Sequence, residues 1–284
     1  MKVKELLAES CHLLACVQDG RLEAEILLSH SLGVNRAWLY ANSDTDVADL
    51  TATSFMQLVK RRRQGEPIAY LTGIREFWSF RLKVTPEVLI PRPETELLVE
   101  TALARIPADT RWRVADLGTG SGAVALAIAT ERPACEVFAS DISARALLVA
   151  RKNAESLNLT GIHFLQGSWL TPLEGKFNGI VSNPPYVARH DPHMQQGDCR
   201  FEPESALSPG TDAMACIRHI AETAPPFLES GGFLAFEHGY DQGEASRQLL
   251  LQLNYEDVET INDLAGLERV TAVSYTHLRA HETR

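Results

Sequence analysis

The sequence contains no apolar run long enough to cross a bilayer. A membrane-spanning helix needs about 18 consecutive apolar residues, and no stretch approaches that length, the charged opening MKVKELLAES included. We therefore expect neither a membrane anchor nor a signal peptide, and we predict a cytoplasmic protein. The hydrophobic content of 45% is ordinary for a globular protein, and 284 residues allow one large domain or two smaller ones.

The five cysteines form no recognisable framework. Their number is odd and no C-x-x-C pair occurs, so the sequence indicates neither a disulfide scaffold nor a zinc site. Buried thiols in a reducing compartment are expected instead. His190 and His193 are close in sequence, but no third ligand accompanies them, so we predict a mobile polar loop there and no metal site.

The chain also lacks an excess of positive charge. It carries 27 Lys and Arg residues against 37 Asp and Glu residues, a formal net charge of −10. Up to Arg75 the two signs balance, so all the excess negative charge lies in the later part of the chain. Proteins that hold a polyanion usually present a basic stripe, and we therefore expect nucleic acid to be an unlikely main partner.

Residues 1–75 show only helical periodicity. The stretch LEAEILLSHSLG repeats apolar residues at helical spacing and stops at Gly33, a residue type common just after a helix end. A later predicted helix ends in four consecutive cations at residues 60–63, which favours either a solvated helix end or a contact with a partner. The pattern predicts an all-helical N-terminal domain.

Residues 76–90 show a period of two, which predicts a β-hairpin linker. The expected apolar face holds Trp78, Phe80, Leu82 and Val84, whereas Phe77 falls on the opposite, mostly polar face. Beyond the linker, short apolar runs alternate with helical segments up to about residue 273. This alternation predicts a doubly wound α/β sheet whose ligand crevice lies at the carboxyl ends of the strands.

A glycine-rich loop, VADLGTGSGA, follows the first predicted strand of this sheet. Gly118, Gly120 and Gly122 would let the backbone approach a ligand closely, and the following helix would present free N–H groups. The spacing also fits the dinucleotide fingerprint, so a nicotinamide or flavin enzyme stays an alternative at this point.

Two residues at the next strand ends fit an adenosine-containing ligand. Asp141 ends the run FASD, where a carboxylate can accept hydrogen bonds from both ribose hydroxyls, although it could also cap the helix that follows. Trp169 follows the third strand and could lie against an adenine ring or belong to the core.

The motif NPPY, residues 183–186, ends the fourth predicted strand opposite the glycine loop. Prolines cannot continue a central strand, and they hold the backbone stiff. The Asn183 side-chain oxygen and the Pro184 carbonyl would then present two fixed acceptors, which match the two hydrogens of a planar NH₂ group. Tyr186 would add a flat wall for a planar substrate.

In this order, DLGTGSG, SD and NPPY resemble the class I S-adenosylmethionine-dependent methyltransferases that methylate planar nitrogens. EPIAYLTGIREFW at 66–78, LIPRPETE at 89–96, GSW, FEPESAL, EHG and ERVT resemble the HemK/PrmC family, the N5-glutamine methyltransferases of peptide chain release factors. The resemblance runs from the first predicted helix to about Ala272. The PRPETE loop and the helical N-terminal domain are not general methyltransferase features, which makes it specific.

The resemblance implies a Rossmann-like, seven-stranded α/β catalytic domain with helices on both faces at residues 91–273. It also implies that the helical domain at 1–75 recognises the release factor. The substrate would be the glutamine of the Gly-Gly-Gln motif of class 1 release factors, and the cofactor S-adenosylmethionine. Separately, we predict a monomer. Residues 274–284 lose the strand pattern, and we predict that they are a non-native tail.

The resemblance also implies roles for individual residues. The cofactor-binding set would be Gly118, Thr119, Gly120, Ser121, Gly122, Asp141, Trp169 and Asn183. The substrate-binding set would be Asn183, Pro184, Pro185 and Tyr186, with Asn183, Pro184 and Tyr186 as the catalytic ones. Arg92 and Glu94, in the PRPET loop, would cover the site.

Alternatives stay open beside this prediction. A DNA adenine-N6 or ribosomal RNA guanine-N2 methyltransferase would use the same clamp on a flipped-out base, although the acidic balance disfavours it. A nicotinamide-dependent oxidoreductase would explain the glycine loop but not NPPY. A non-catalytic adaptor that binds release factors is the third alternative.

Overall fold

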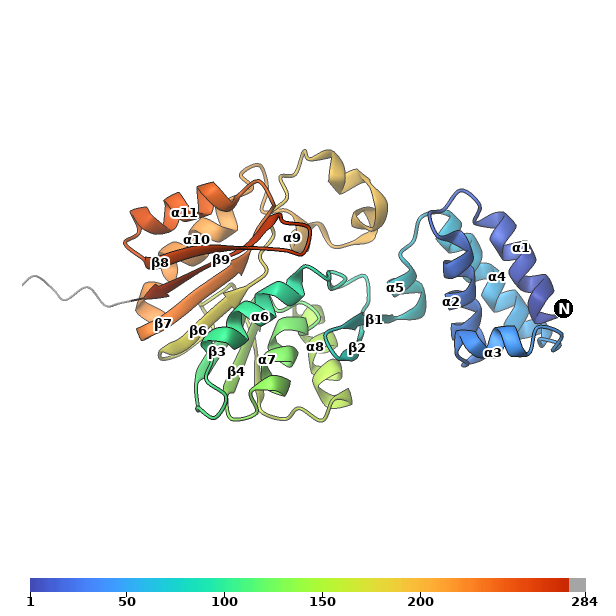
Figure 1. The fold of residues 1–284 in the computed structure, drawn as a ribbon, viewed down its shortest axis with the longest axis horizontal. Helices are drawn as coiled ribbons and strands as arrows, with labels where there is room; N and C mark the ends of the chain where they lie inside the picture. Colours follow the sequence, from blue (N-terminus) through green and yellow to red (C-terminus); the bar gives the residue numbers. More distant parts are fainter. Residues whose placement is uncertain (276–284) are drawn as a thin grey trace, which may run out of the picture. The chain divides into compact units, whose positions relative to one another are not determined.

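The protein, seen in a computed structural model that describes residues 1–275, divides into two compact units. The first comprises residues 1–74 together with residues 195–201. The second comprises residues 75–194 and the described chain from residue 202 onward. Figure 1 labels the elements of both units.

The first unit is helical, as the sequence predicts. Its helices are α1 (Val3–Leu13), α2 (Gly20–Leu32), α3 (Arg36–Ala41), α4 (Asp49–Arg63) and α5 (Ile68–Thr72). Gly33 ends α2 with a φ of 68°, a left-handed conformation that glycine adopts at little cost. Fully buried side chains such as Leu6, Leu28 and Phe55 form one apolar core between these helices.

The hairpin consists of β1 (Ile74–Phe77) and β2 (Phe80–Lys83). The prediction of its faces was wrong at the turn, because Phe77 is buried and only 2% exposed. Trp78 occupies the turn with a φ of 55°, which breaks the alternation on which the prediction rested. Its backbone N–H donates to Glu96 Oε1 (2.7 Å) and its indole N–H to Glu131 Oε1 (2.8 Å), so the turn is anchored to the second unit.

The second unit contains a sheet that has seven strands within the described residues, in the order β5-β4-β3-β6-β7-β9-β8. The strands are β3 (Arg113–Leu117), β4 (Glu136–Asp141), β5 (Ile162–Gln166), β6 (Phe177–Ser182), β7 (Leu228–Glu237), β8 (Glu256–Asn262) and β9 (Glu268–Tyr275). Neighbouring strands from β5 to β7 pair in parallel, and β9 pairs antiparallel with both β7 and β8. This confirms the predicted class I methyltransferase sheet.

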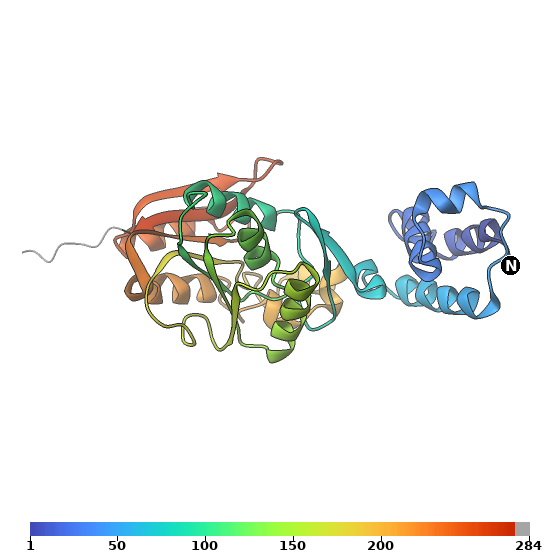
Figure 2. The ribbon, with the colours of Figure 1, turned by 90° about the horizontal axis from the view of Figure 1, so that it is seen from below.

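Helices cover both faces of the sheet (Figures 1 and 2). Successive strand residues point to opposite faces, so Phe233 packs in one core cluster and Leu234 in the other. The first cluster includes side chains of α6 (Thr95–Arg105), α7 (Ala123–Glu131) and α8 (Ala144–Ser156). The second includes side chains of α10 (Ala215–Thr223) and α11 (Gly243–Gln252).

The pairing registers bring the ends of the central strands to one edge of the sheet. Leu117 pairs with both Ser140 and Ser182, and Ser182 pairs with Phe236. The loops that follow β3, β4, β6 and β7 therefore start side by side at the carboxyl edge. This is the edge at which the sequence predicts the ligand crevice.

The predicted non-native tail lies mostly outside the described residues, which end at Tyr275. Ser274 and Tyr275 pair with Phe233 and Gly232 of β7, so β9 extends two residues into the segment predicted as tail. None of the helices in residues 1–275 has the length and apolar character that a membrane span requires.

Candidate functional site

A cavity of about 410 Å³ opens at the carboxyl edge of the sheet in the second unit. Its volume falls within the range of about 300–1,000 Å³ that small-molecule sites occupy. Eight of the predicted site residues line it: Gly118, Thr119, Gly120, Ser121, Asp141, Trp169, Asn183 and Pro185. Predicted residues outside its lining are Arg92, Glu94, Gly122, Pro184 and Tyr186.

The glycines of the loop after β3 serve different purposes. Gly118, Gly120 and Gly122 all have positive φ values, of 70°, 55° and 88°. A Cβ atom at Gly120 would meet no protein atom within 4 Å, so the space beside it belongs to the cavity. A Cβ atom at Gly122 would lie 3.2 Å from Ala150 Cβ, which indicates that this glycine allows α7 to pack closely against α8.

Asp116, at the end of β3, is a buried carboxyl that the sequence prediction missed. Its Oδ2 atom accepts hydrogen bonds from Thr119 Oγ1 (2.6 Å) and from the backbone N–H of Ala125 (3.2 Å). Burial raises the pKa of Asp116 to about 7, although these two bonds oppose the rise. The side chain is 2% exposed and lines the cavity, so a carboxyl whose pKa is close to neutral pH lies next to the glycine loop.

We expect Asp116 to make the folded protein less stable as the pH rises from about 4 to about 7. The folded protein keeps the proton up to a pKa of about 7, whereas the unfolded chain releases it near 3.8, so the folded state binds more protons in this window. The loss should total roughly 4 kcal/mol. Asp116→Asn should remove it, and urea unfolding at several pH values measures the slope. Asp109→Asn, at an exposed carboxylate, should keep the slope of the unmodified protein; an unchanged slope in Asp116→Asn would contradict the assignment.

Asp141 ends β4 and faces the glycine loop. Its Oδ2 atom accepts the backbone N–H of Gly120 (2.9 Å), and its Oδ1 atom accepts the backbone N–H of Ser143 (2.8 Å). Burial raises its pKa, and the two hydrogen bonds partly offset the rise. The sequence left open whether Asp141 caps the following helix. The N-cap residue is Ser143, whose hydroxyl accepts the N–H of Ala146, so Asp141 is not needed as a cap.

Trp169 lies in the loop after β5 and lines the cavity. Its φ of 51° is unusual for a bulky residue, and such conformations cost about 1–3 kcal/mol. The backbone carbonyl is fixed by a hydrogen bond from Ser140 Oγ (2.7 Å), and the indole ring lies beside Gly118. The ring is only partly buried against the core and also borders the cavity; its predicted contact with an adenine ring stays a prediction.

The motif at residues 183–186 follows β6 directly. Ser182 ties this strand end to the glycine loop's strand, because its hydroxyl donates to the Leu117 carbonyl (2.8 Å). The Asn183 amide donates from Nδ2 to Thr95 Oγ1 (3.0 Å). This bond uses the amino half of the amide and leaves Oδ1 available as an acceptor. Thr95, the first residue of α6, also lines the cavity and was not among the predicted residues.

The PRPET loop is joined to the chain after residue 201 by a carboxylate. Glu202 forms an ion pair with Arg92 and also accepts the backbone N–H of Ile90 at Oε1 (2.9 Å). Its side chain is buried, so the pair fixes the loop at both its backbone and its guanidinium. The FEPESAL motif contains Glu202, but the sequence gives no sign of its partner 110 residues away.

Comparison with known proteins places both units. Residues 93–199 match the methyltransferase small domain family, and residues 5–73 match the PrmC N-terminal domain family. Release factor glutamine methyltransferase of Escherichia coli (strain K12) is 49% identical over 276 residues, which cover 97% of this chain and 99% of that protein. The protein of that name from Neisseria gonorrhoeae is 48% identical over 263 residues, 91% of this chain and 95% of that protein.

A solved methyltransferase structure from Pyrococcus furiosus is similar in fold. It is 18% identical, covers 77% of this chain and 98% of its own, and has a TM-score of 0.54. At that identity the likeness shows the fold alone.

Proposed function

The chain belongs to the release factor glutamine methyltransferase family, and from this premise we propose that it methylates the glutamine of the Gly-Gly-Gln motif in class 1 release factors. The methyl group goes from S-adenosylmethionine to the side-chain nitrogen N5 of that glutamine. The observation that carries the proposal is Asn183, which lines the cavity beside the glycine loop with its amide anchored on Thr95.

The cavity residues fit S-adenosylmethionine. Glycine at position 120 leaves open space where a side chain would stand, and residues 118–122 would hold the methionine and ribose part. Asp141 would bind the ribose hydroxyls, and Trp169 would lie beside the adenine. Asp141 also gives the wall an acidic residue, which suits a ligand with a sulfonium and an ammonium group. When bound, this cofactor supplies an electrophilic methyl group.

The chain's own contribution is to orient the glutamine amide. An amide nitrogen is a weak nucleophile because its lone pair is delocalised, so positioning matters most. Asn183 Oδ1 and the Pro184 carbonyl would each accept one N–H of the substrate amide, and both bonds strengthen as positive charge develops on that nitrogen. Once the new N–C bond has formed, one of these protons passes to water, which leaves a neutral N-methylated amide. Pro185 and Tyr186 complete the clamp, and Arg92 and Glu94 would cover the site.

The partner and the setting follow from the same proposal. A class 1 release factor is the protein substrate, and the helical unit would contribute to its recognition. We propose that the protein works as a monomer in the cytoplasm, with no membrane and no nucleic acid as partner; the net charge of −10 supports the last point.

Mass spectrometry of a release factor incubated with the protein and S-adenosylmethionine tests the activity. We expect a gain of about 14 Da, one added CH₂, on the peptide that contains Gly-Gly-Gln. A release factor with alanine in place of that glutamine is the control and should gain nothing. Methylation of DNA or ribosomal RNA with an unmodified release factor would refute the proposal, as would tight NAD binding without S-adenosylmethionine binding.

A further inference from the structure

Tyr186 is held at two points by the turn between β7 and α11. Its phenol donates to Glu237 Oε1 (2.8 Å), the last residue of β7. Its backbone carbonyl accepts a hydrogen bond from Gln242 Nε2 (2.9 Å), and Gln242 precedes α11. The Oε1 atom of Gln242 in turn accepts the Gly239 N–H (2.9 Å). One short turn therefore fixes both ends of the tyrosine that closes the NPPY motif.

Glu237 is a carboxyl buried in the interior of the protein, where its desolvation is unfavourable. It is 1% exposed, and its carboxyl interacts with the Tyr186 phenol and with the Thr95 hydroxyl, both of which oppose the rise in pKa that burial causes. Burial raises the pKa of both Glu237 and Tyr186, so the phenol keeps its proton and serves as the donor. A leucine at this position would leave the buried Tyr186 phenol without its acceptor, so the carboxyl bears directly on how Tyr186 is held.

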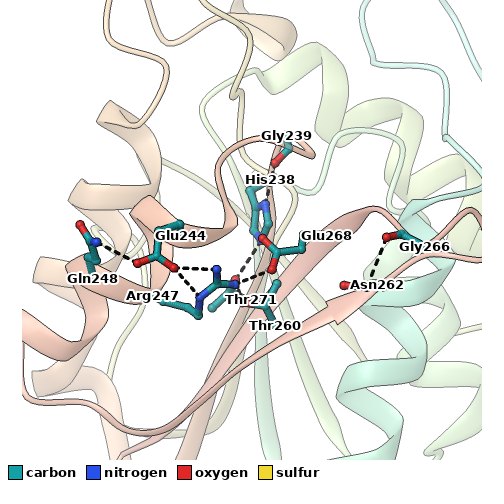
Figure 3. A network of polar contacts seen from close by, with 10 residues as sticks. All are labelled: His238, Gly239, Glu244, Arg247, Gln248, Thr260, Asn262, Gly266, Glu268 and Thr271. Carbon is teal, nitrogen blue, oxygen red and sulfur yellow. Dashed lines mark hydrogen bonds and ion pairs between the residues drawn. The ribbon is translucent and has the colours of Figure 1, made fainter.

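The turn that carries Glu237 and Gln242 is itself rigid. Figure 3 shows His238, which is fully buried, between the Gly239 carbonyl (2.8 Å from Nδ1) and Thr271 Oγ1 (2.9 Å from Nε2). The carbonyl can only accept, so Nδ1 carries the proton and Nε2 accepts from the threonine. Burial lowers the pKa of His238, which keeps the ring neutral. The turn is thereby fastened to β9.

An ion-pair network fastens the next helix to the same strand. Arg247 of α11 bonds to Glu244 (2.8 Å) and to Glu268 of β9 (2.7 Å), as Figure 3 also shows. The start of α11, where Gln242 lies, thus has little freedom to move relative to β7. A rigid support of this kind can transmit its geometry to the loop that it holds.

We propose that Glu237 and Gln242 are positioning residues that hold Tyr186 in one orientation and so set the NPPY clamp against the substrate amide. The inference rests on the proposed function. Pro185 lines the cavity, whereas Tyr186 lies outside the lining and is bonded to this turn, so the turn supports the motif at its last residue. Misplacing a reacting group by about 1 Å can cost about 100-fold in rate. Loss of the bond from Glu237 or Gln242 should therefore lower kcat and leave the affinity for the cofactor unchanged.

The test compares variants that keep or remove each bond. Glu237→Leu and Tyr186→Phe should each lower kcat about 10- to 100-fold, with the Kd for S-adenosylmethionine and the KM for the release factor within about 3-fold. Glu237→Gln should keep most of the activity, because its amide oxygen can still accept the phenol proton. The double variant Glu237→Leu/Tyr186→Phe should be no slower than either single one, since both remove the same bond.

If Glu237→Leu does not fold, Gln242→Ala tests the same inference. It removes the bond to the Tyr186 carbonyl at a half-buried position and should also lower kcat about 10-fold. Gln248→Ala, at an exposed glutamine on the same helix, is the matched control and should have the original kcat. Unchanged kcat in Gln242→Ala and Tyr186→Phe, or additive losses in the double variant, would overturn the inference. Inactive unmodified protein would instead refute the proposed function.

Discussion

Replacing Asn183 with alanine is expected to lower kcat for release-factor methylation about 1,000-fold. The substitution removes Oδ1, one of two acceptors that fix the substrate amide, and it also removes the Nδ2 bond to Thr95 that orients the side chain (3.0 Å). Loss of a single preorganised hydrogen-bonding group at a reacting centre costs about 100- to 1,000-fold. Asn183 would both orient the substrate amide and stabilise the positive charge that develops on its nitrogen. We therefore expect a loss at the upper end of this range.

Cofactor binding separates this effect from collapse of the cavity. The glycine loop and Asp141 do not depend on the Asn183 side chain for their hydrogen bonds, so the Kd for S-adenosylmethionine should rise by less than about 10-fold. Asn262→Ala, at an exposed asparagine, is the control and should keep the original kcat. Single-turnover methylation with saturating cofactor gives the rate of the transfer itself. Unimpaired methylation by Asn183→Ala would refute the clamp.

Thr95 connects the two motifs that the sequence analysis singled out. Its hydroxyl accepts the Asn183 bond, and the residue is the threonine of the PRPET motif that the sequence singles out, at the start of α6. The loop motif is thus connected to NPPY through one hydrogen bond across 88 positions of sequence. Sequence reasoning found both motifs but could not find the bond, because spacing along the chain carries no information on contacts between distant segments.

The ends of the central strands were predictable for a definite reason. In a parallel sheet all carboxyl ends meet at one edge, so a glycine loop after β3, an aspartate at the end of β4 and NPPY after β6 had to converge. Asp141 and Asn183 accordingly line one cavity. The supporting carboxylates were not predictable in the same way. Glu202 and Glu237 lie inside the motifs FEPESAL and EHG, but their roles depend on partners supplied by other loops.

Local conformation explains the remaining differences. The hairpin alternation failed at Phe77 because Trp78 adopts a left-handed turn conformation that no periodicity rule anticipates for tryptophan. Gly122 fits the glycine pattern by type, yet the contact beside it is with Ala150 on the next helix. A glycine that a ligand requires and a glycine that packing requires look alike in sequence, and only the neighbouring atoms distinguish them.

Gly120→Val is expected to weaken S-adenosylmethionine binding at least about 100-fold while the fold survives. The new side chain would enter the cavity, because a Cβ atom at this position meets no protein atom within 4 Å and the residue lines the cavity wall. The φ of 55° adds backbone strain of roughly 1–2 kcal/mol for a residue with a side chain. Strain alone would lower stability, whereas occupation of the cavity would lower affinity.

Gly266→Val separates these two effects. Gly266 has a φ of 78° and open space around its Cβ position, but it lies in an exposed turn outside the cavity lining. It should lose a similar amount of stability in urea unfolding and keep the original Kd in calorimetric titration with S-adenosylmethionine. Equal Kd values for Gly120→Val and the unmodified protein would mean that the cofactor does not use the space beside the glycine loop. A 100-fold difference corresponds to about 2.7 kcal/mol of binding free energy, which direct exclusion from the cavity explains and a distant conformational effect does not.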